Sequence, residues 1–187
     1  MDNKVISNNC TPKKILQVPV IKGFGEKQEL VVREIVISPP NPSVFRIINV
    51  DKVVTITSFK LIATDDNDDS QPFFRAKVII DGFIDKNINY KTIADFTKDA
   101  VGGPVFQFTT RIDFATFVDV KAKEPIVETD QVEILNAFVE GEIEELLDPN
   151  PVPVGAPSFA VTFNKILEKM VVKIKLKVVR IEHVTLK

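Results

Sequence analysis

The stretch from Val105 to Val120, VFQFTTRIDFATFVDV, decides the fold class because apolar and polar residues alternate along it. The apolar members at even positions are Phe106, Phe108, Ile112, Phe114, Val118 and Val120. Successive side chains of a β-strand point to opposite faces of a sheet, so this period of two predicts a long strand with one dry face and one mostly wet face. Phe117 interrupts the polar face and marks a candidate second contact surface.

Further segments rich in Val, Ile and Phe are also predicted to be strands. They are Glu29–Ile37, Phe45–Ala63, Phe74–Ile84, Ile88–Ile93, Val132–Ile143 and Val171–Val184. The residues Asp85, Lys86 and Asn87 separate two of these segments and are predicted to form a hairpin turn. The segment Phe159–Lys169 has apolar residues at helical spacing and fits a short helix or a strand, and the strands around it favour a strand.

The chain is predicted to form one all-β domain behind an extended N-terminal arm. Residues 1–23 form the arm, whose first part lacks a clear core pattern, and residues 24–187 form the domain. Strands at this density, punctuated by Pro and Gly, are typical of a β-sandwich or jelly-roll-like domain. The acidic run Thr64–Ser70 and the proline-rich stretch Asp148–Pro157 are predicted to be loops, with an edge position as the alternative for the second.

Composition excludes several classes of function. With 187 residues and 44% hydrophobic residues, the chain is long and apolar enough to fold without a disulfide or a metal. The formal net charge of −2 argues against nucleic acid or an anionic membrane as the main partner. The first residues contain no apolar run of the kind found in signal peptides, so we expect the protein to be made in the cytoplasm.

The sequence contains little catalytic chemistry, and we predict a protein that is not an enzyme and has no cofactor. The single histidine, His183, has no nucleophile motif to serve and is interpreted as a strand residue near the chain end. One Cys and one His cannot fill a usual zinc site. No metal is predicted, although clustered carboxylates can bind calcium. The candidates for such a site are Asp65, Asp66, Asp68 and Asp69.

The N-terminal arm contains the candidate contacts between subunits. Cys10 is the only cysteine, so it is either a free thiol or half of a disulfide to a neighbouring subunit. The apolar residues of the arm, which would pair with the sheet edge of a neighbour, are Ile15, Leu16, Val18 and Val20.

Two charged stripes predict one strand pairing. Lys173, Lys175 and Lys177 share one face of the last strand because they alternate with apolar residues. Glu140, Glu142 and Glu144 alternate in the same way, so we expect them to share a face and to pair with the lysines across two neighbouring strands. One alternative is that the lysines guard an edge strand. The other is that these glutamates, together with Glu145, form a solvated face or an acid/base pair for sugar hydrolysis.

Several of these segments resemble the SPOCS domain family. The resemblance begins at Val78–Tyr90, which contains the pattern G-x-I-x-K-x-I-x-Y, and continues at Arg111–Val120, Val139–Ile143 and Lys173–Val178. It spans about Phe45 to Arg180. The family occurs in endospore-forming bacteria and implies spore-coat and spore-envelope assembly rather than catalysis. No peptidoglycan-binding LysM module is evident, so a wall-anchoring role is not implied.

The sequence therefore predicts a self-assembling structural protein of the endospore surface: coat, exosporium or spore appendage fibre. Its expected partners are copies of itself and other spore-envelope proteins, with no nucleic acid and no membrane. The alternative is a module that binds carbohydrate or cell-wall polymer. The composition of one Tyr and no Trp counts against that alternative because sugar platforms are usually built from these residues.

Overall fold

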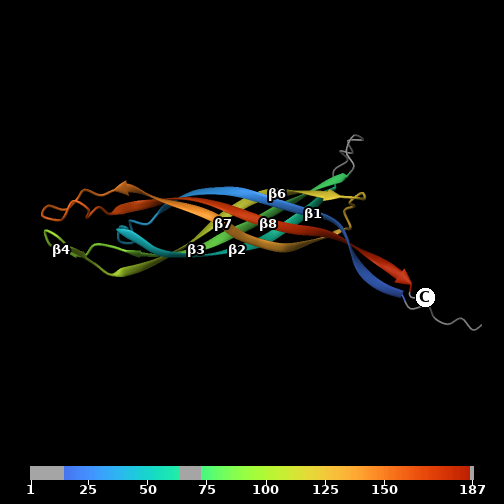
Figure 1. Ribbon diagram of the computed structural model, residues 1–187, viewed down its shortest axis with the longest axis horizontal. Coiled ribbons are helices and arrows are strands. Elements are labelled where there is room, and N and C mark those ends of the chain that lie inside the picture. The colour runs from blue at the N-terminus through green and yellow to red at the C-terminus, as the bar shows by residue number, and fades with distance from the viewer. Residues whose placement is uncertain (1–14, 64–72, 186–187) are drawn as a thin grey trace, which may run out of the picture.

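The computed structural model describes residues 15–63 and 73–185, and these form an all-β protein (Figure 1). The long strands, in chain order, are β1 (Ile15–Val36), β2 (Arg46–Ala63), β3 (Phe74–Lys91), β6 (Val105–Ala122), β7 (Gln131–Pro149) and β8 (Phe163–Thr185). Two short strands, β4 (Asp95–Phe96) and β5 (Val101–Gly102), pair only with each other. The all-β prediction is confirmed.

The long strands form one antiparallel sheet in the order β2-β3-β6-β1-β8-β7. The sheet curls into a half-barrel, so its two outer strands, β2 and β7, come to lie against each other. We predicted a β-sandwich or jelly-roll-like domain, and the sheet is instead continuous through the β1–β6 pairing. Its two halves still face each other across a shared core, as they would in a sandwich.

Two glycines make the join between the halves possible. β1 pairs with β6 only at Gly23, Phe24 and Gly25. A Cβ atom on Gly25 would lie 2.6 Å from Cγ1 of Val118, and one on Gly23 would lie 2.7 Å from the carbonyl oxygen of Lys121. Only residues without a side chain allow this close approach of two backbones.

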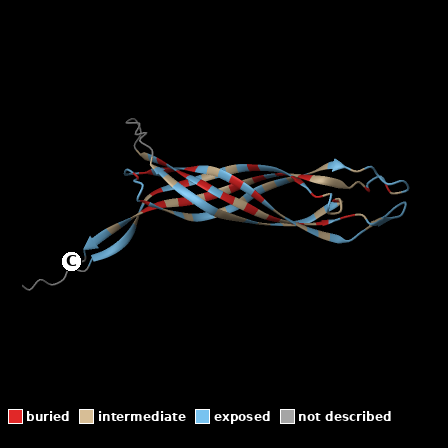
Figure 2. Cartoon of the chain, turned by 180° about the vertical axis from the view of Figure 1, so that it is seen from behind, coloured by how far each residue is buried: buried red, intermediate tan, exposed pale blue. Residues whose placement is uncertain are grey.

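The core lies inside the curl and is built by strict alternation (Figure 2). On β3 the buried positions are Ala76, Val78, Ile80, Gly82, Ile84, Lys86, Ile88 and Tyr90. On β8 they include Ile166, Glu168, Met170, Val172, Ile174, Leu176 and Val178. The alternation predicted for β6 is confirmed, since its even positions are buried or partly buried. Phe117 is 43% exposed on the outer face, where the ammonium of Lys77 lies 4.3 Å from its ring centroid.

One local prediction is wrong, and one that favoured a strand is confirmed from Phe163 on. Asp85, Lys86 and Asn87 do not form a turn, because β3 runs unbroken through them and pairs with β2 and β6 on both sides. The ambiguous segment 159–169 enters a strand at Phe163, and its helical spacing is accidental. The proline-rich stretch forms a loop after β7 ends at Pro149. The acidic run 64–72 lies outside the described residues.

One end of the molecule is a two-stranded ribbon. From Ile15 to Ile21, β1 pairs with β8 alone, and Figure 1 shows these two strands running out together beyond the rest of the sheet. Among the described residues, no helix is long and apolar enough to cross a membrane.

Candidate functional site

A cluster of charged side chains lies in the core, and we call it the buried charge cluster. Its members are Lys52 on β2, Lys86 on β3, Glu142 and Glu144 on β7, and Glu168 on β8. The side chains of Lys86 and Glu168 are fully buried, whereas those of Lys52, Glu142 and Glu144 are about a fifth to a quarter exposed. The cluster therefore links both halves of the curled sheet at its open side.

Lys86 is the centre of this cluster. Its Nζ lies 2.5 Å from Oε2 of Glu168, 3.1 Å from Oε1 of Glu144 and 3.3 Å from Oε2 of Glu142. Lys52 forms a further ion pair with Glu142. Oε1 of Glu168 is buried and has no hydrogen-bond partner. A buried acceptor without a hydrogen bond lowers the stability of the folded state, so the hydrogen bonding of the cluster is incomplete at Glu168.

The environment shifts the pKa values of these groups in different directions. Burial opposes the charged form of Lys86, but hydrogen bonding and attraction from Glu168 and then Glu144 raise its pKa overall. Burial raises the pKa of Glu168, and the hydrogen bond from Lys86 only partly offsets this. Burial alone would raise the pKa of Glu142, but the ammonium groups of Lys52 and Lys86 lower it below the ordinary value. Lys86 is thus held as a cation, while Glu168 has an increased affinity for a proton.

A β-bulge explains how two of these glutamates come to face inward. The register between β7 and β8 shifts between Val139 and Gly141. Beyond the shift, Glu142 lies opposite the buried Met170, and Glu144 lies opposite Glu168. The bulge leaves Glu140 on the outer face. Our prediction that the three glutamates share one face is therefore wrong, because an extra residue in the strand reverses the alternation.

We predicted that the two charged stripes lie on neighbouring strands and pair with each other. The strands are neighbours, and one of the predicted ion pairs forms. β7 and β8 are adjacent, and Lys173 forms an ion pair of 3.0 Å with Glu140. Lys175 pairs instead with Glu26 on β1, at 3.4 Å, and Lys177 pairs with Glu133, at 2.8 Å. The lysines of β8 thus contact acidic residues on both neighbouring strands and do not guard an edge.

Three carboxylates of the cluster lie close enough together to contact a single cation. Oxygen atoms of Glu142, Glu144 and Glu168 lie within 4.8 Å of one another. All three carboxylates form hydrogen bonds with Nζ of Lys86, so an ammonium group already occupies the position that a metal cation would take. The arrangement therefore fits an internal ammonium ion better than a divalent metal. The calcium candidates Asp65, Asp66, Asp68 and Asp69 lie outside the described residues.

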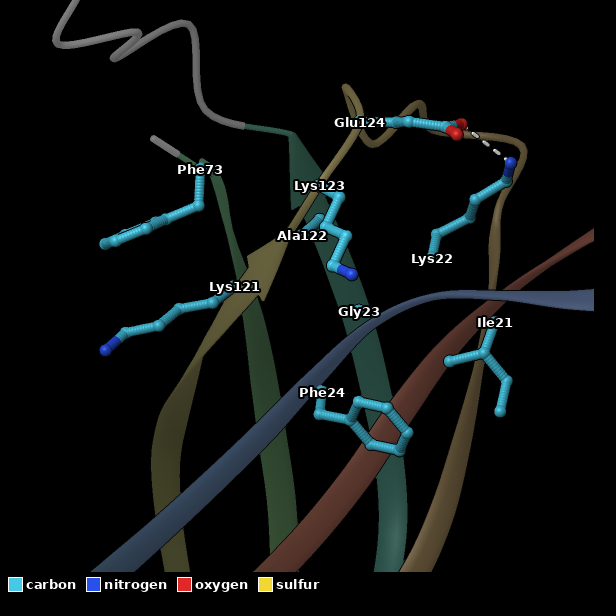
Figure 3. A pocket seen from close by; sticks show the side chains of 9 residues that line it. All are labelled: Ile21, Lys22, Gly23, Phe24, Phe73, Lys121, Ala122, Lys123 and Glu124. Carbon is cyan, nitrogen blue, oxygen red and sulfur yellow. Dashed lines mark hydrogen bonds and ion pairs between the residues drawn. The ribbon is translucent and has the colours of Figure 1, made fainter. Parts of the chain in front are cut away.

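A hollow of about 430 Å³ lies where β1 crosses to β6 (Figure 3). Its apolar lining includes Ile21, Phe24 and Phe73, and Lys121 lies with its Nζ 5.3 Å from the ring centroid of Phe73. Lys22 at its rim bonds Glu124 at 2.7 Å. The hollow is open to solvent, and we assign it no ligand.

The predicted subunit contacts fall at the ribbon. Ile15, Leu16, Val18 and Val20 are extended in β1, where they pair with β8 of the same chain. Ile15 is 63% exposed and Leu16 is 47% exposed, so both have apolar surface free in this chain. A contact with a neighbouring subunit stays a prediction, and Cys10 lies outside the described residues. His183 is exposed in β8, beside Gln17.

Comparison with protein families identifies the family of the chain. The family model described as SipL, SPOCS domain matches residues 43–146, which is more than half of the chain. The matched residues contain β2, β3, β6 and most of β7, so the match ends before the segment Lys173–Val178 on which we also based the resemblance. Neither the curated proteins nor the solved structures gave a match.

Proposed function

Because the chain belongs to the SPOCS domain family, we propose that it is a self-assembling structural protein of the bacterial endospore surface. It would be a subunit of the coat, the exosporium or a spore appendage fibre, with subunits linked through the N-terminal arm. The family match is the observation that supports this proposal, since the family suggests spore-coat assembly and a non-enzymatic role.

The ribbon supports the proposed mode of assembly. Over Ile15–Ile21 the second edge of β1 has no strand beside it among the described residues. This stretch contains no charged residue, although charges are a common device for blocking exposed edges, and Pro19 is its one residue of an edge-blocking type. Residues 1–14 precede this stretch in the sequence, and in our proposal they add to the sheet of a neighbouring copy.

The exposed aromatic surface gives no support to the alternative of a carbohydrate-binding module. The single tyrosine, Tyr90, is buried and donates a hydrogen bond to the carbonyl oxygen of Pro42. The chain has no Trp, so no Tyr or Trp platform is presented to a sugar ring.

Truncation of the arm tests the proposal. β1 begins at Ile15 and is part of the sheet, so the deletion must stop at residue 14. We expect the full chain to form polymers in electron micrographs and light scattering, and the chain without residues 1–14 to remain a folded monomer. Unchanged assembly by the shortened chain would reject the role of the arm.

Cys10 is tested in the same assemblies. If it joins neighbours, non-reducing gels will show dimers that disappear with a thiol reductant and are absent from Cys10→Ser. A Cys10 that reacts fully with an alkylating reagent in intact assemblies would contradict the disulfide.

A further inference from the structure

Along β2 and β7 the open side of the curled sheet is held by side chains, and only at one end does a backbone bridge join Val44, before β2, to Phe163 at the start of β8. β2 pairs only with β3, and β7 pairs only with β8, so no described backbone ladder joins the two edge strands where they meet. The ion pair of Lys52 with Glu142 joins β2 to β7 directly. Lys86 on β3 adds contacts to Glu142 and Glu144 on β7 and to Glu168 on β8. We call this junction the β2/β7 seam.

The charges at the seam do not balance. The groups that face one another there are two ammonium groups, on β2 and β3, and three carboxylates, on β7 and β8. When all of them are ionised, one negative charge is left over. The surplus is most costly at Glu168, because that side chain is fully buried and its Oε1 has no partner.

We propose that the β2/β7 seam is a latch whose closed form binds one proton at Glu168. A proton there cancels the surplus charge while Lys86 keeps its contacts to Glu142 and Glu144. A proton also fits the site where a metal does not, because Nζ of Lys86 already fills the space among the carboxylates.

The sign of the pH effect follows from the burial of Glu168. Burial raises its pKa above the ordinary value of 4.5, so the closed form binds a proton that the open, hydrated form releases. Between 4.5 and the raised value, closure is therefore favoured as the pH falls and weakened as it rises. The population of the open form changes by up to about tenfold for each unit by which the pKa is raised. The inference concerns the inside of one subunit and does not depend on the proposed assembly.

Titration of Glu168 in the full chain is the direct test. Carbon NMR of the side-chain carboxyls, assigned with Glu168→Gln, should show Glu168 protonating above pH 4.5, the ordinary value for glutamate. Titration at or below that value would overturn the proposal. This measurement uses the unaltered protein, so it stays decisive even if a variant fails to fold.

The movement of the seam needs its own measurement. Val53 on β2 is 63% exposed and Ile143 on β7 is 67% exposed, so both accept spin labels as cysteines in a Cys10→Ser background. The distance between the labels should widen as the pH rises through the titration of Glu168, and Glu168→Gln should abolish that change. A distance that does not respond to pH in the unaltered cluster would overturn the latch. Tightening by added calcium or manganese, without a proton effect, would assign the site to a metal and also overturn it.

Discussion

Nζ of Lys86 on β3 lies 2.5 Å from Oε2 of Glu168 on β8, and both side chains are fully buried although 82 residues separate them in the sequence. The pair joins the two halves of the curled sheet through its core. Apolar side chains surround the pair on both strands, so neither charged group can replace its contact with the other by a contact with water.

Removal of the buried ammonium should be strongly destabilising. Lys86→Met leaves carboxylates in the core without their central cation, so we expect a loss of about 3–5 kcal/mol in the free energy of unfolding. Urea denaturation measures it. Lys165→Met is the matched control, because Lys165 pairs with Glu34 on the surface, and it should unfold close to the unaltered protein. Equal stability of both variants would contradict the role of the cluster.

Adding one side-chain carbon at the join between the halves should also destabilise the fold. In Gly25→Ala the new Cβ would meet Val118 and the carbonyl oxygen of Asp119, at 2.6 and 2.9 Å. We expect a loss of roughly 1–3 kcal/mol, by thermal or urea unfolding. The control is Gly141→Ala, since a Cβ there has no neighbour within 4 Å and should change stability by less than about 0.5 kcal/mol. A tolerated alanine at Gly25 would show that β1 and β6 need no close approach.

The bulge in β7 predicts which charges interact. A double-mutant cycle between Lys173 and Glu140 should show a coupling that weakens with added salt, because the pair is on the outer face. The same cycle between Lys175 and Glu142 should show no coupling, since Glu142 turns into the core. Coupling in the second cycle would mean that the alternation of β7 is not reversed at the bulge.

Asp130 and Glu168 should respond to pH with opposite signs. Burial acts against the charged form of Asp130, but hydrogen bonds from Arg180, at 2.6 and 2.8 Å, and from the backbone of Val127 lower its pKa. Its stabilising effect is therefore present above the ordinary value of 3.8 and lost as the pH falls through the lowered pKa. Asp130→Asn should cost about 1–3 kcal/mol at pH 7, and the difference from the unaltered protein should shrink in acid.

The pH dependence of stability has the opposite sign for Glu168, because burial raises its pKa. Glu168→Gln resembles the protonated form, so the unaltered protein should approach the stability of this variant as the pH falls and drop below it as the pH rises. Urea unfolding across the pH range measures both variants together. Parallel pH curves for Asp130→Asn and Glu168→Gln would be inconsistent with the assigned environments.

The strand character of the chain was predictable from alternation, and the buried charge cluster was not. In β6 every even position is buried or partly buried and every odd position is exposed, so the sequence pattern and the structure agree there. Lys86 occupies the same alternating row as Ile84 and Ile88, and that row was the signal for an inward lysine. Asp85 and Asn87 on either side of it are residues typical of turns, so the sequence predicted a turn there and not a continuation of the strand alternation. The partner Glu168 could not be inferred, because its contact depends on the curl of the sheet.

The register of β7 shows a second limit of sequence patterns. Glu140, Glu142 and Glu144 alternate perfectly in the sequence, but a bulge inserts one residue and turns the last two inward. A bulge depends on how the partner strand packs, and the alternation itself contains no sign of it. The curling of the sheet at Gly23 and Gly25 is similar, because close approach of β1 to β6 follows from tertiary packing.

The most direct test of the central claim is to locate the protein on spores. Antibodies raised against the chain should label the surface layers of mature spores in thin-section immunogold micrographs, in continuous layers or along fibres, and the label should be absent when the chain is deleted. Label confined to the cytoplasm of sporulating cells, with unlabelled spore surfaces, would contradict a structural role at the endospore surface.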